Sequence, residues 1–159
     1  MKFCIHRIRL RGVLSLLLLL LLHQNTKIQV SAMRLVLQRV KSASVTVEGN
    51  IISKIGPGVV ALVGLHENDN EENLKDCCKK LLAAKLWEND NGGMWRHGVK
   101  QKNFDVLCVS QFTLYGKLSK KNQPDYKLAM KSVPAEALYC QFLEMLRENY
   151  QDDKIFDGK

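Results

Sequence analysis

Apolar residues alternate with polar ones in two segments after Met33, and this pattern predicts β-strands. The first segment includes Leu35 and Leu37 and the second Val45 and Val47, and a Glu-Gly-Asn turn at 48–50 separates the second from the next apolar pair. Residues 59–65 and 104–109 are short, nearly continuous apolar runs, as expected for buried strands. We therefore expect the domain to begin as a β-meander and residues 104–109 to form a central strand.

Two later stretches have helical spacing and predict amphipathic helices. The first carries an apolar stripe opposite several lysines, and Asp69 with Glu72 resembles a capping box at its start. The second follows Pro134, which suits the first turn of a helix. The stripe residues are Leu74, Cys77, Cys78, Leu81 and Leu82 in the first helix and Leu138, Phe142, Met145 and Leu146 in the second. The predicted fold is α+β, with a mixed or antiparallel, barrel-like sheet covered by two helices.

Polar side chains follow the predicted central strand directly. Ser110, Gln111 and Thr113 place two hydroxyls and an amide within four residues, just before Gly116. Strand ends are common positions for binding and catalytic groups. Serine and threonine at such a place can also satisfy backbone groups without any further role.

The charge of the chain is uneven. The formal net charge is +8, but residues 1–32 hold five of the 24 Lys and Arg residues and no acid, which leaves +3 for residues 33–159. Within the domain, residues 117–131 are the most basic stretch, with five lysines and the single acid Asp125. Such groups hold phosphates without reading sequence, although a soluble loop has the same composition.

Residues 1–32 have a basic start and an apolar run at 13–22, which is shorter than the roughly 20 residues that span a bilayer. Three interpretations remain open for this leader: a secretory signal, an organellar transit peptide, and an extension without a targeting function. The remaining length suits one domain, at residues 33–159. We expect no membrane association of the mature domain.

The cysteines argue against an oxidising compartment. There are five of them, Cys4, Cys77, Cys78, Cys108 and Cys140, without the spacing of a disulfide framework. We expect buried thiols. No Cys-x-x-Cys pair occurs and the histidines are isolated, so we expect neither a metal site nor a cofactor.

Several motifs in one order resemble a known family. Ser110-Gln111-Phe112-Thr113 resembles the SQxT signature of the D-aminoacyl-tRNA deacylases, also called D-tyrosyl-tRNA deacylases. Residues 33–40 resemble the opening strand of that family, residues 55–58 and 62–65 its next hairpin, and residues 122–126 and 128–130 its NxPDF and AM segments. The resemblance extends from Met33 to the last residue.

The resemblance implies a function in translation quality control. Family members hydrolyse the ester of mischarged D-aminoacyl-tRNA, with glycine mischarged onto tRNA-Ala as a further substrate, and act as cytoplasmic homodimers. By position, Ser110, Gln111, Phe112 and Thr113 would form the catalytic loop. Arg39 would contact the proline loop of the partner subunit, and Met130 would lie near the pocket for the terminal adenosine. Among the basic residues, Lys117, Lys120 and Lys121 are candidates for tRNA binding.

The chemistry of the motif supports a particular mechanism. Hydrolysis of an activated ester mainly needs a stabilised carbonyl oxygen and a placed water, which the amides near Phe112 and Thr113 could provide. No histidine or carboxylate is close to the motif in the sequence, and no Ser-His-Asp triad motif is present. A second possibility is that Thr113 acts as a nucleophile.

One family motif has no counterpart. A Gly-Pro-Val-Thr sequence, which excludes L-amino acids in the family, should follow residues such as 156–159, and the only Gly-Pro here is Gly56-Pro57. We therefore expect residues 33–159 to be a deacylase domain without its last strands, with an unpaired sheet edge and weak or no activity. The alternative function is that of a non-catalytic nucleic-acid-binding protein of the same fold.

Overall fold

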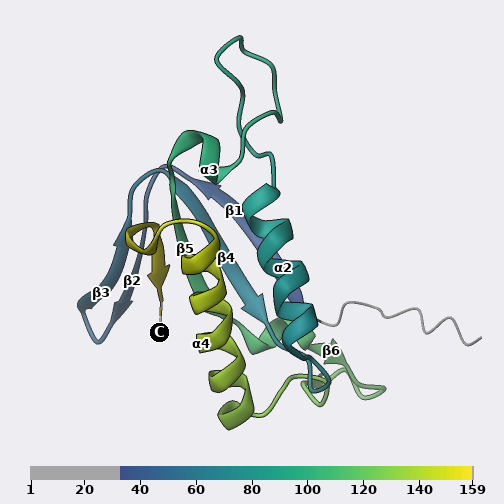
Figure 1. The fold of residues 1–159 in the computed structure, drawn as a ribbon. Helices are drawn as coiled ribbons and strands as arrows, with labels where there is room; N and C mark the ends of the chain where they lie inside the picture. The colour runs from purple at the N-terminus through teal and green to yellow at the C-terminus, as the bar shows by residue number, and fades with distance from the viewer. Residues whose placement is uncertain (1–32, 159) are drawn as a thin grey trace, which may run out of the picture. The chain divides into compact units, whose positions relative to one another are not determined.

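The computed structural model describes residues 33–158, which contain a four-stranded sheet (Figure 1). The strand order is β1-β4-β5-β8. The strands are β1 (Arg34–Val40), β4 (Gly58–Gly64), β5 (Asp105–Ser110) and β8 (Ile155–Asp157). β1 runs antiparallel to β4, whereas β5 is parallel to both of its neighbours. The prediction of a central strand at residues 104–109 is confirmed.

The first strands do not pair in chain order, so the expected meander is wrong. β2 (Ala43–Val47) and β3 (Asn50–Ile55) form a separate hairpin, and β1 pairs with β4 rather than with β2. The expected α+β class with a mixed sheet is confirmed. The described strands do not close into a barrel, because β1 and β8 are opposite edges of the sheet and each pairs on one side.

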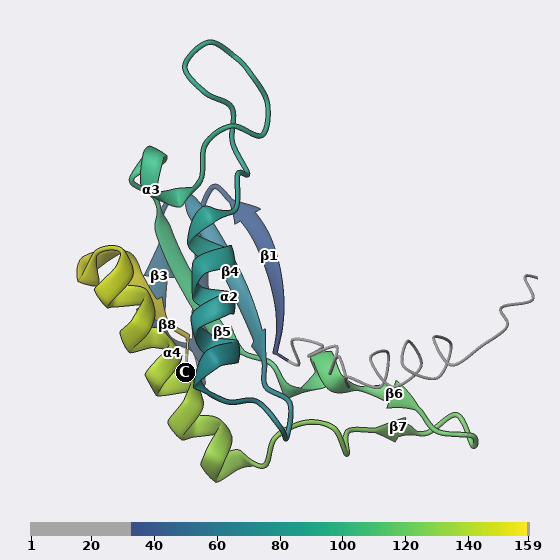
Figure 2. The same cartoon turned by 45° about the vertical axis from the view of Figure 1, so that its right-hand side comes forward.

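The two predicted amphipathic helices are present and cover one face of the sheet (Figures 1 and 2). They are α2 (Glu71–Ala83) and α4 (Ser132–Asn149), and a short α3 (Val99–Lys102) precedes β5. The predicted capping box is displaced by one residue. Asn70 accepts from the amide of Asn73, and the Asn73 side chain accepts from the amide of Asn70. Asp69 instead accepts from the His66 amide at 2.6 Å.

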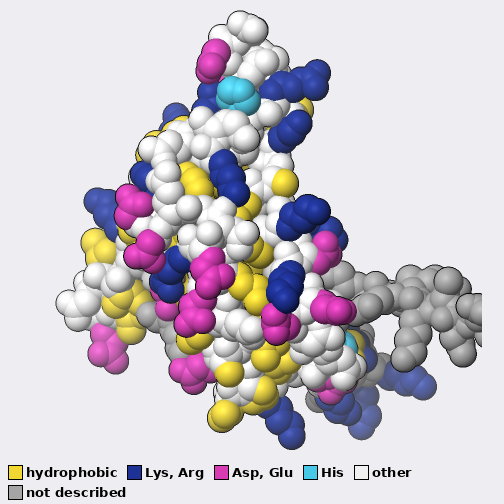
Figure 3. Space-filling view, in the orientation of Figure 1, with side chains coloured by type: hydrophobic (Ala, Val, Ile, Leu, Met, Phe, Trp, Pro, Cys, Tyr) yellow, Lys and Arg dark blue, Asp and Glu magenta, His cyan; other side chains and the backbone are white. Residues whose placement is uncertain are grey.

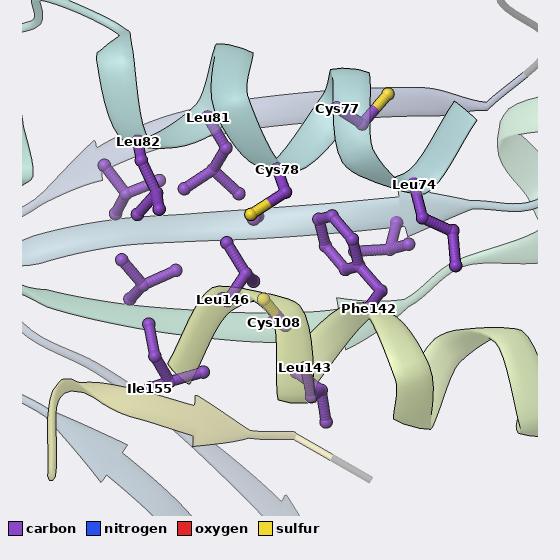
Figure 4. Close-up of a cluster of buried hydrophobic side chains, with 14 of the residues drawn as sticks. Leu74, Cys77, Cys78, Leu81, Leu82, Cys108, Phe142, Leu143, Leu146 and Ile155 are labelled. Carbon is purple, nitrogen blue, oxygen red and sulfur yellow. The ribbon is translucent and has the colours of Figure 1, made fainter. Parts of the chain in front are cut away.

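The hydrophobic core lies between these helices and the sheet (Figure 4). Leu74 and Leu81 from α2 and Phe142 and Leu146 from α4 are nearly inaccessible to solvent. They pack against alternate residues of the central strands, which include Val59, Ala61, Val63, Val106 and Cys108. Burial of this apolar surface is the main favourable contribution to folding.

The remaining elements lie at the ends of the sheet. β5 continues into a 3₁₀ turn, η1 (Phe112–Tyr115), and then into a small hairpin of β6 (Lys117–Leu118) and β7 (Pro124–Asp125) (Figure 2). A second 3₁₀ turn, η2 (Asp152–Lys154), leads into β8, which the polar sequence did not predict. Helices long and apolar enough for a bilayer do not occur in residues 33–158. The leader predicted at 1–32 lies outside the described residues.

Three cysteines are buried as expected, and one is not. Cys77, Cys78 and Cys108 lie in the core, whereas Cys140 is exposed because it lies on α4 away from the stripe that faces the sheet. Cys4 lies outside the described residues. Burial raises the pKa of the Cys108 thiol to about 12, so its reactive thiolate is scarce near neutral pH.

This difference predicts selective alkylation. Iodoacetamide near pH 8 should modify Cys140 in the native protein and leave Cys108 unmodified, as peptide mass spectrometry would report. Equal labelling of the two peptides under native conditions would contradict the packing. Unfolding in urea before alkylation is the control, and it should expose both thiols.

Candidate functional site

The predicted catalytic loop lies at the end of β5 and changes from strand to 3₁₀ turn within two residues. Ser110 is the last strand residue and pairs with Val63 of β4. The Gln111 amide then donates to the Val63 carbonyl at 2.8 Å, and the Leu114 amide donates to the Gln111 carbonyl at 3.2 Å. The turn is therefore attached directly to the central strand pair.

The amides of Phe112 and Thr113 come before the first hydrogen bond of this turn. The first N–H groups of a helical turn have no acceptor within it, and within the described residues these two amides have no backbone acceptor elsewhere. The loop faces outward: Phe112 is 56% exposed and Thr113 is also exposed. Two neighbouring amide donors are thus available to an oxygen atom outside the chain.

The polar side chains of the motif interact with each other. The Gln111 side-chain amide donates to the Thr113 hydroxyl. The Thr113 hydroxyl therefore accepts a hydrogen bond from an amide and has no base among its hydrogen-bond partners in residues 33–158, so this contact does not activate it as a nucleophile. The geometry supports the amides, rather than the hydroxyl, as the chemical groups of the loop.

The β6–β7 hairpin lies next to the loop and carries the predicted basic residues. The rings of Phe112 and Tyr126 meet edge to face at 5.1 Å, which joins the loop to the residue that directly follows β7. Lys117 is in β6, and Lys120 and Lys121 are in the exposed turn of the hairpin. The structure therefore brings these three lysines to the same end of the sheet as residues 110–113.

Met130 also lies near this end, whereas Arg39 does not. The Met130 amide donates to the carbonyl of Leu65, immediately after β4. Arg39 pairs with Val59 of β4, whereas Ser110 pairs with Val63 of the same strand. The four residues between Val59 and Val63 separate Arg39 from the loop by about 13 Å along β4. Its guanidinium donates to the Leu86 carbonyl at 3.0 Å and lies 3.7 Å from Glu88. Its assigned contact with a partner subunit stays a prediction.

Arg34 contacts the loop, and sequence reasoning missed it. Its Nη1 donates to the Leu114 carbonyl at 2.6 Å, and the guanidinium lies over the Tyr115 ring, 4.6 Å from the centroid. The alternating pattern placed Arg34 at the start of a strand. It gave no indication that this strand would lie beside β4 and reach the motif, 80 residues later.

Two ionisable residues lie behind the loop, although none is near it in the sequence. The His66 ring meets Tyr115 edge to face at 5.2 Å, and Asp69 is buried close by. Burial raises the pKa of the Asp69 carboxyl. Burial also raises the pKa of Tyr115, and the nearby charge of Asp69 raises it further. The Asp69 carboxylate accepts from the His66 amide at 2.6 Å, and Nδ1 of His66 accepts from the Asn68 amide at 3.2 Å. His66 and Asp69 therefore pack behind the loop and do not form its exposed surface.

A large cavity lies elsewhere, on the helical face of the sheet. Its volume is about 790 Å³, and residues of α2, α3 and α4 line it, among them Cys78, Lys100 and Met145. Figure 3 shows apolar, acidic and basic side chains together on this face. None of the predicted site residues lines this cavity. Residues 33–158 contain no cluster of His, Cys, Asp and Glu that could hold a metal ion.

Comparisons with known proteins identify relatives of this chain. The family model described as D-Tyr-tRNA(Tyr) deacylase matches residues 36–159. A D-aminoacyl-tRNA deacylase of Drosophila melanogaster is 47% identical over 127 residues, which cover 80% of this chain and 79% of the fly protein. D-aminoacyl-tRNA deacylase 1 of Mus musculus is 45% identical over 127 residues, and this chain spans only 60% of its length.

Solved structures show the same fold. One described as a c-Myc DNA unwinding element binding protein has a TM-score of 0.75 and 43% identity, and the match covers 79% of this chain and 83% of that one. A probable eukaryotic D-amino acid tRNA deacylase has a TM-score of 0.62, covers 73% and 67% of the two chains, and at 19% identity supports the fold alone. By the extent of the family match and the identity to the fly protein, the chain belongs to the D-Tyr-tRNA(Tyr) deacylase family.

Proposed function

We propose that this chain hydrolyses the ester of mischarged D-aminoacyl-tRNA and releases free amino acid and tRNA, as a step of translation quality control. One observation carries the proposal: the amides of Phe112 and Thr113 lie at the exposed end of β5 and have no backbone acceptor among residues 33–158. The names of the relatives favour this enzyme over a non-catalytic nucleic-acid-binding protein.

The two amides would act on the carbonyl of the ester. When water adds to the carbonyl carbon, its oxygen gains negative charge, and two N–H donors lower the free energy of that state. The bond between carbon and the ribose oxygen then breaks, and one proton from the water goes to the ribose oxygen. The tRNA regains its hydroxyl, and the amino acid leaves with a new carboxylate after releasing the second proton to solvent.

This mechanism does not need a strong base in the loop, because an aminoacyl ester is already activated. Ser110 and Gln111 would position the substrate at the strand end, and the exposed Phe112 ring offers an apolar surface beside the amides. The 2′-hydroxyl of the substrate would assist the attack, as the resemblance to the family implies. The main contribution of the protein is orientation of the ester next to fixed donors.

The proposal is tested with purified protein and tRNA charged with a D-amino acid, the matching L-amino acid or, on tRNA-Ala, glycine. Loss of the D-aminoacyl ester well above the spontaneous rate supports it, with free amino acid and intact tRNA as products. Binding of the charged tRNA without loss of the ester would reject the enzyme and favour the non-catalytic alternative.

We also propose that the basic hairpin binds the tRNA phosphates. Replacing Lys117, Lys120 and Lys121 together by glutamine should raise the KM for aminoacyl-tRNA and leave kcat nearly unchanged. The salt dependence of binding should also weaken, by about 0.7 to 0.9 in log–log slope for each phosphate that the variant no longer neutralises. Binding titrations at several salt concentrations measure this slope.

The control variant removes the same number of positive charges outside the hairpin. It replaces three exposed lysines by glutamine: Lys79 in α2, Lys85 after α2 and Lys100 in α3. If their triple glutamine variant weakens tRNA binding as strongly, net charge rather than the hairpin accounts for the effect.

We further propose a homodimer, formed through the sheet face opposite the helices. Leu35 and Leu37 pack toward the helices, so the intervening Val36, which is 46% exposed, faces the other way. Apolar residues exposed on such a face favour association. Sedimentation should give twice the chain mass, and Val36→Glu should shift the protein toward the monomer. A monomer at every concentration would reject the dimer.

We propose a cytoplasmic location, with organellar import or secretion as the alternatives if residues 1–32 act as a leader. A fusion of residues 1–32 to a reporter distinguishes them. A cytosolic, uncleaved product supports the proposal, and a cleaved product in an organelle or the medium contradicts it.

A further inference from the structure

The exposed amides lie between two fixed points of the backbone. At one end, the Gln111 amide is bonded to the Val63 carbonyl of β4, 2.8 Å away. At the other end, the Leu114 carbonyl accepts from Arg34 of β1, at 2.6 Å. Both fixed points belong to the same sheet, because β1 and β4 are paired. The direction of the Phe112 and Thr113 amides therefore depends on both attachments.

Arg34 makes a second contact one residue further along the chain. Its guanidinium lies 4.6 Å from the centroid of the Tyr115 ring, a geometry in which a cation is attracted to the ring face. A planar guanidinium can stack on a ring and donate to a carbonyl at once, and a lysine ammonium cannot reproduce that geometry. Arg34 thus holds two successive residues of the turn.

The Tyr115 ring that Arg34 contacts is held in place by its surroundings. Its side chain is 3% exposed, and its ring meets His66 edge to face at 5.2 Å. Its hydroxyl has no hydrogen-bond partner among the described residues, so the ring rather than the hydroxyl makes the useful contacts. Leu114 is also confined, because a Cβ on Gly64 would lie 2.9 Å from the Leu114 Cβ.

We propose that Arg34 and the ring of Tyr115 form a positioning pair that fixes the direction of the Phe112 and Thr113 amides. The pair acts through the turn and does not touch the reacting atoms. This inference rests on the proposed function, because it gives the pair a role in that reaction. Loss of the pair should lower the rate of ester hydrolysis rather than the affinity for tRNA.

The variants Arg34→Lys and Arg34→Ala test the pair under single-turnover conditions. Both should slow hydrolysis about 10- to 100-fold with little change in KM, because small misplacements of catalytic groups are costly. Tyr115→Phe keeps the ring and should hydrolyse the ester at the parent rate. Tyr115→Leu removes the ring and should be as slow as the Arg34 variants. The matched control is Arg96→Ala, which removes an exposed arginine outside the site.

A direct phosphate contact by Arg34 would give a different result. In that case Arg34→Lys would keep the rate, and Arg34→Ala would raise KM and weaken the salt dependence. That outcome would overturn the positioning pair. A rate of Tyr115→Leu equal to that of Tyr115→Phe would also contradict it.

Hydrogen exchange provides a readout that does not depend on activity. The Leu114 and Gly116 amides are bonded within the turn, to Gln111 and Thr113. Their exchange should be faster in Arg34→Ala than in the parent or in Arg96→Ala, and unchanged exchange would reject the pair. If the parent protein fails to hydrolyse D-aminoacyl-tRNA, the proposed function fails, and the exchange measurement still decides whether the pair fixes the turn.

Discussion

Phe112→Pro should slow hydrolysis of D-aminoacyl-tRNA about 100- to 1000-fold, the reduction expected when one donor to a developing oxyanion is removed. Proline has no N–H, so the substitution removes the Phe112 amide from the site. The position suits proline because Phe112 is the first residue of a helical turn and Gln111 before it, with φ −142° and ψ 85°, lies outside the α region that proline disfavours in the preceding residue. Proline at Thr113 would be a poorer test, since it would force Phe112 out of the turn.

The control for this prediction is Phe112→Ala. Alanine removes the same ring, together with its contact with Tyr126, and keeps the amide. The ratio of the Ala and Pro rates under single-turnover conditions therefore measures the amide alone, whatever the absolute rate of the parent chain. Equal rates for the two variants would mean that this amide does not stabilise the transition state.

Phe142→Ala should lower the free energy of unfolding by about 3–5 kcal/mol, the range for truncating a buried aromatic residue. Phe142 is 0% exposed and lies where α2 and α4 both meet the sheet (Figure 4). Its removal would leave a cavity that the neighbouring helices could fill only in part. Urea unfolding followed by circular dichroism measures the change.

A second substitution in the same helix provides the comparison. Val133 of α4 is 81% exposed, so Val133→Ala should change the unfolding free energy by less than about 0.5 kcal/mol. If both variants unfold at the same urea concentration, Phe142 does not contribute to the core as the packing indicates.

The parts of the fold that local sequence determines were predictable. The central strand and the polar groups at its end follow from an apolar run that Ser110, Gln111 and Thr113 terminate, and the helices follow from their spacing. The pairing of β1 with β4 could not be predicted, because strand partners distant in the chain leave no mark on local periodicity. β8 was missed since three residues are too few for a pattern.

The same limit applies to the site. Ser110, Gln111, Phe112 and Thr113 are contiguous, so one motif identified them together. Arg34 reaches the turn only because β1 lies against β4, and His66 lies behind it only because of the loop after β4. Contacts of this kind depend on tertiary structure. Chemistry within a motif can therefore be predicted from sequence, whereas the residues that support the motif require the fold.

The parallel pairing of β5 with both neighbours affects the order in which the protein can fold during synthesis. A parallel neighbour must be reached through a crossover, and here α2 lies in the crossover before β5 and α4 in the one after it. The ribosome therefore releases the Ser-Gln-Phe-Thr turn well before Ile155 can pair with Val106. Nascent chains in that interval would hold the turn on a strand with one open edge, which chaperones bind readily.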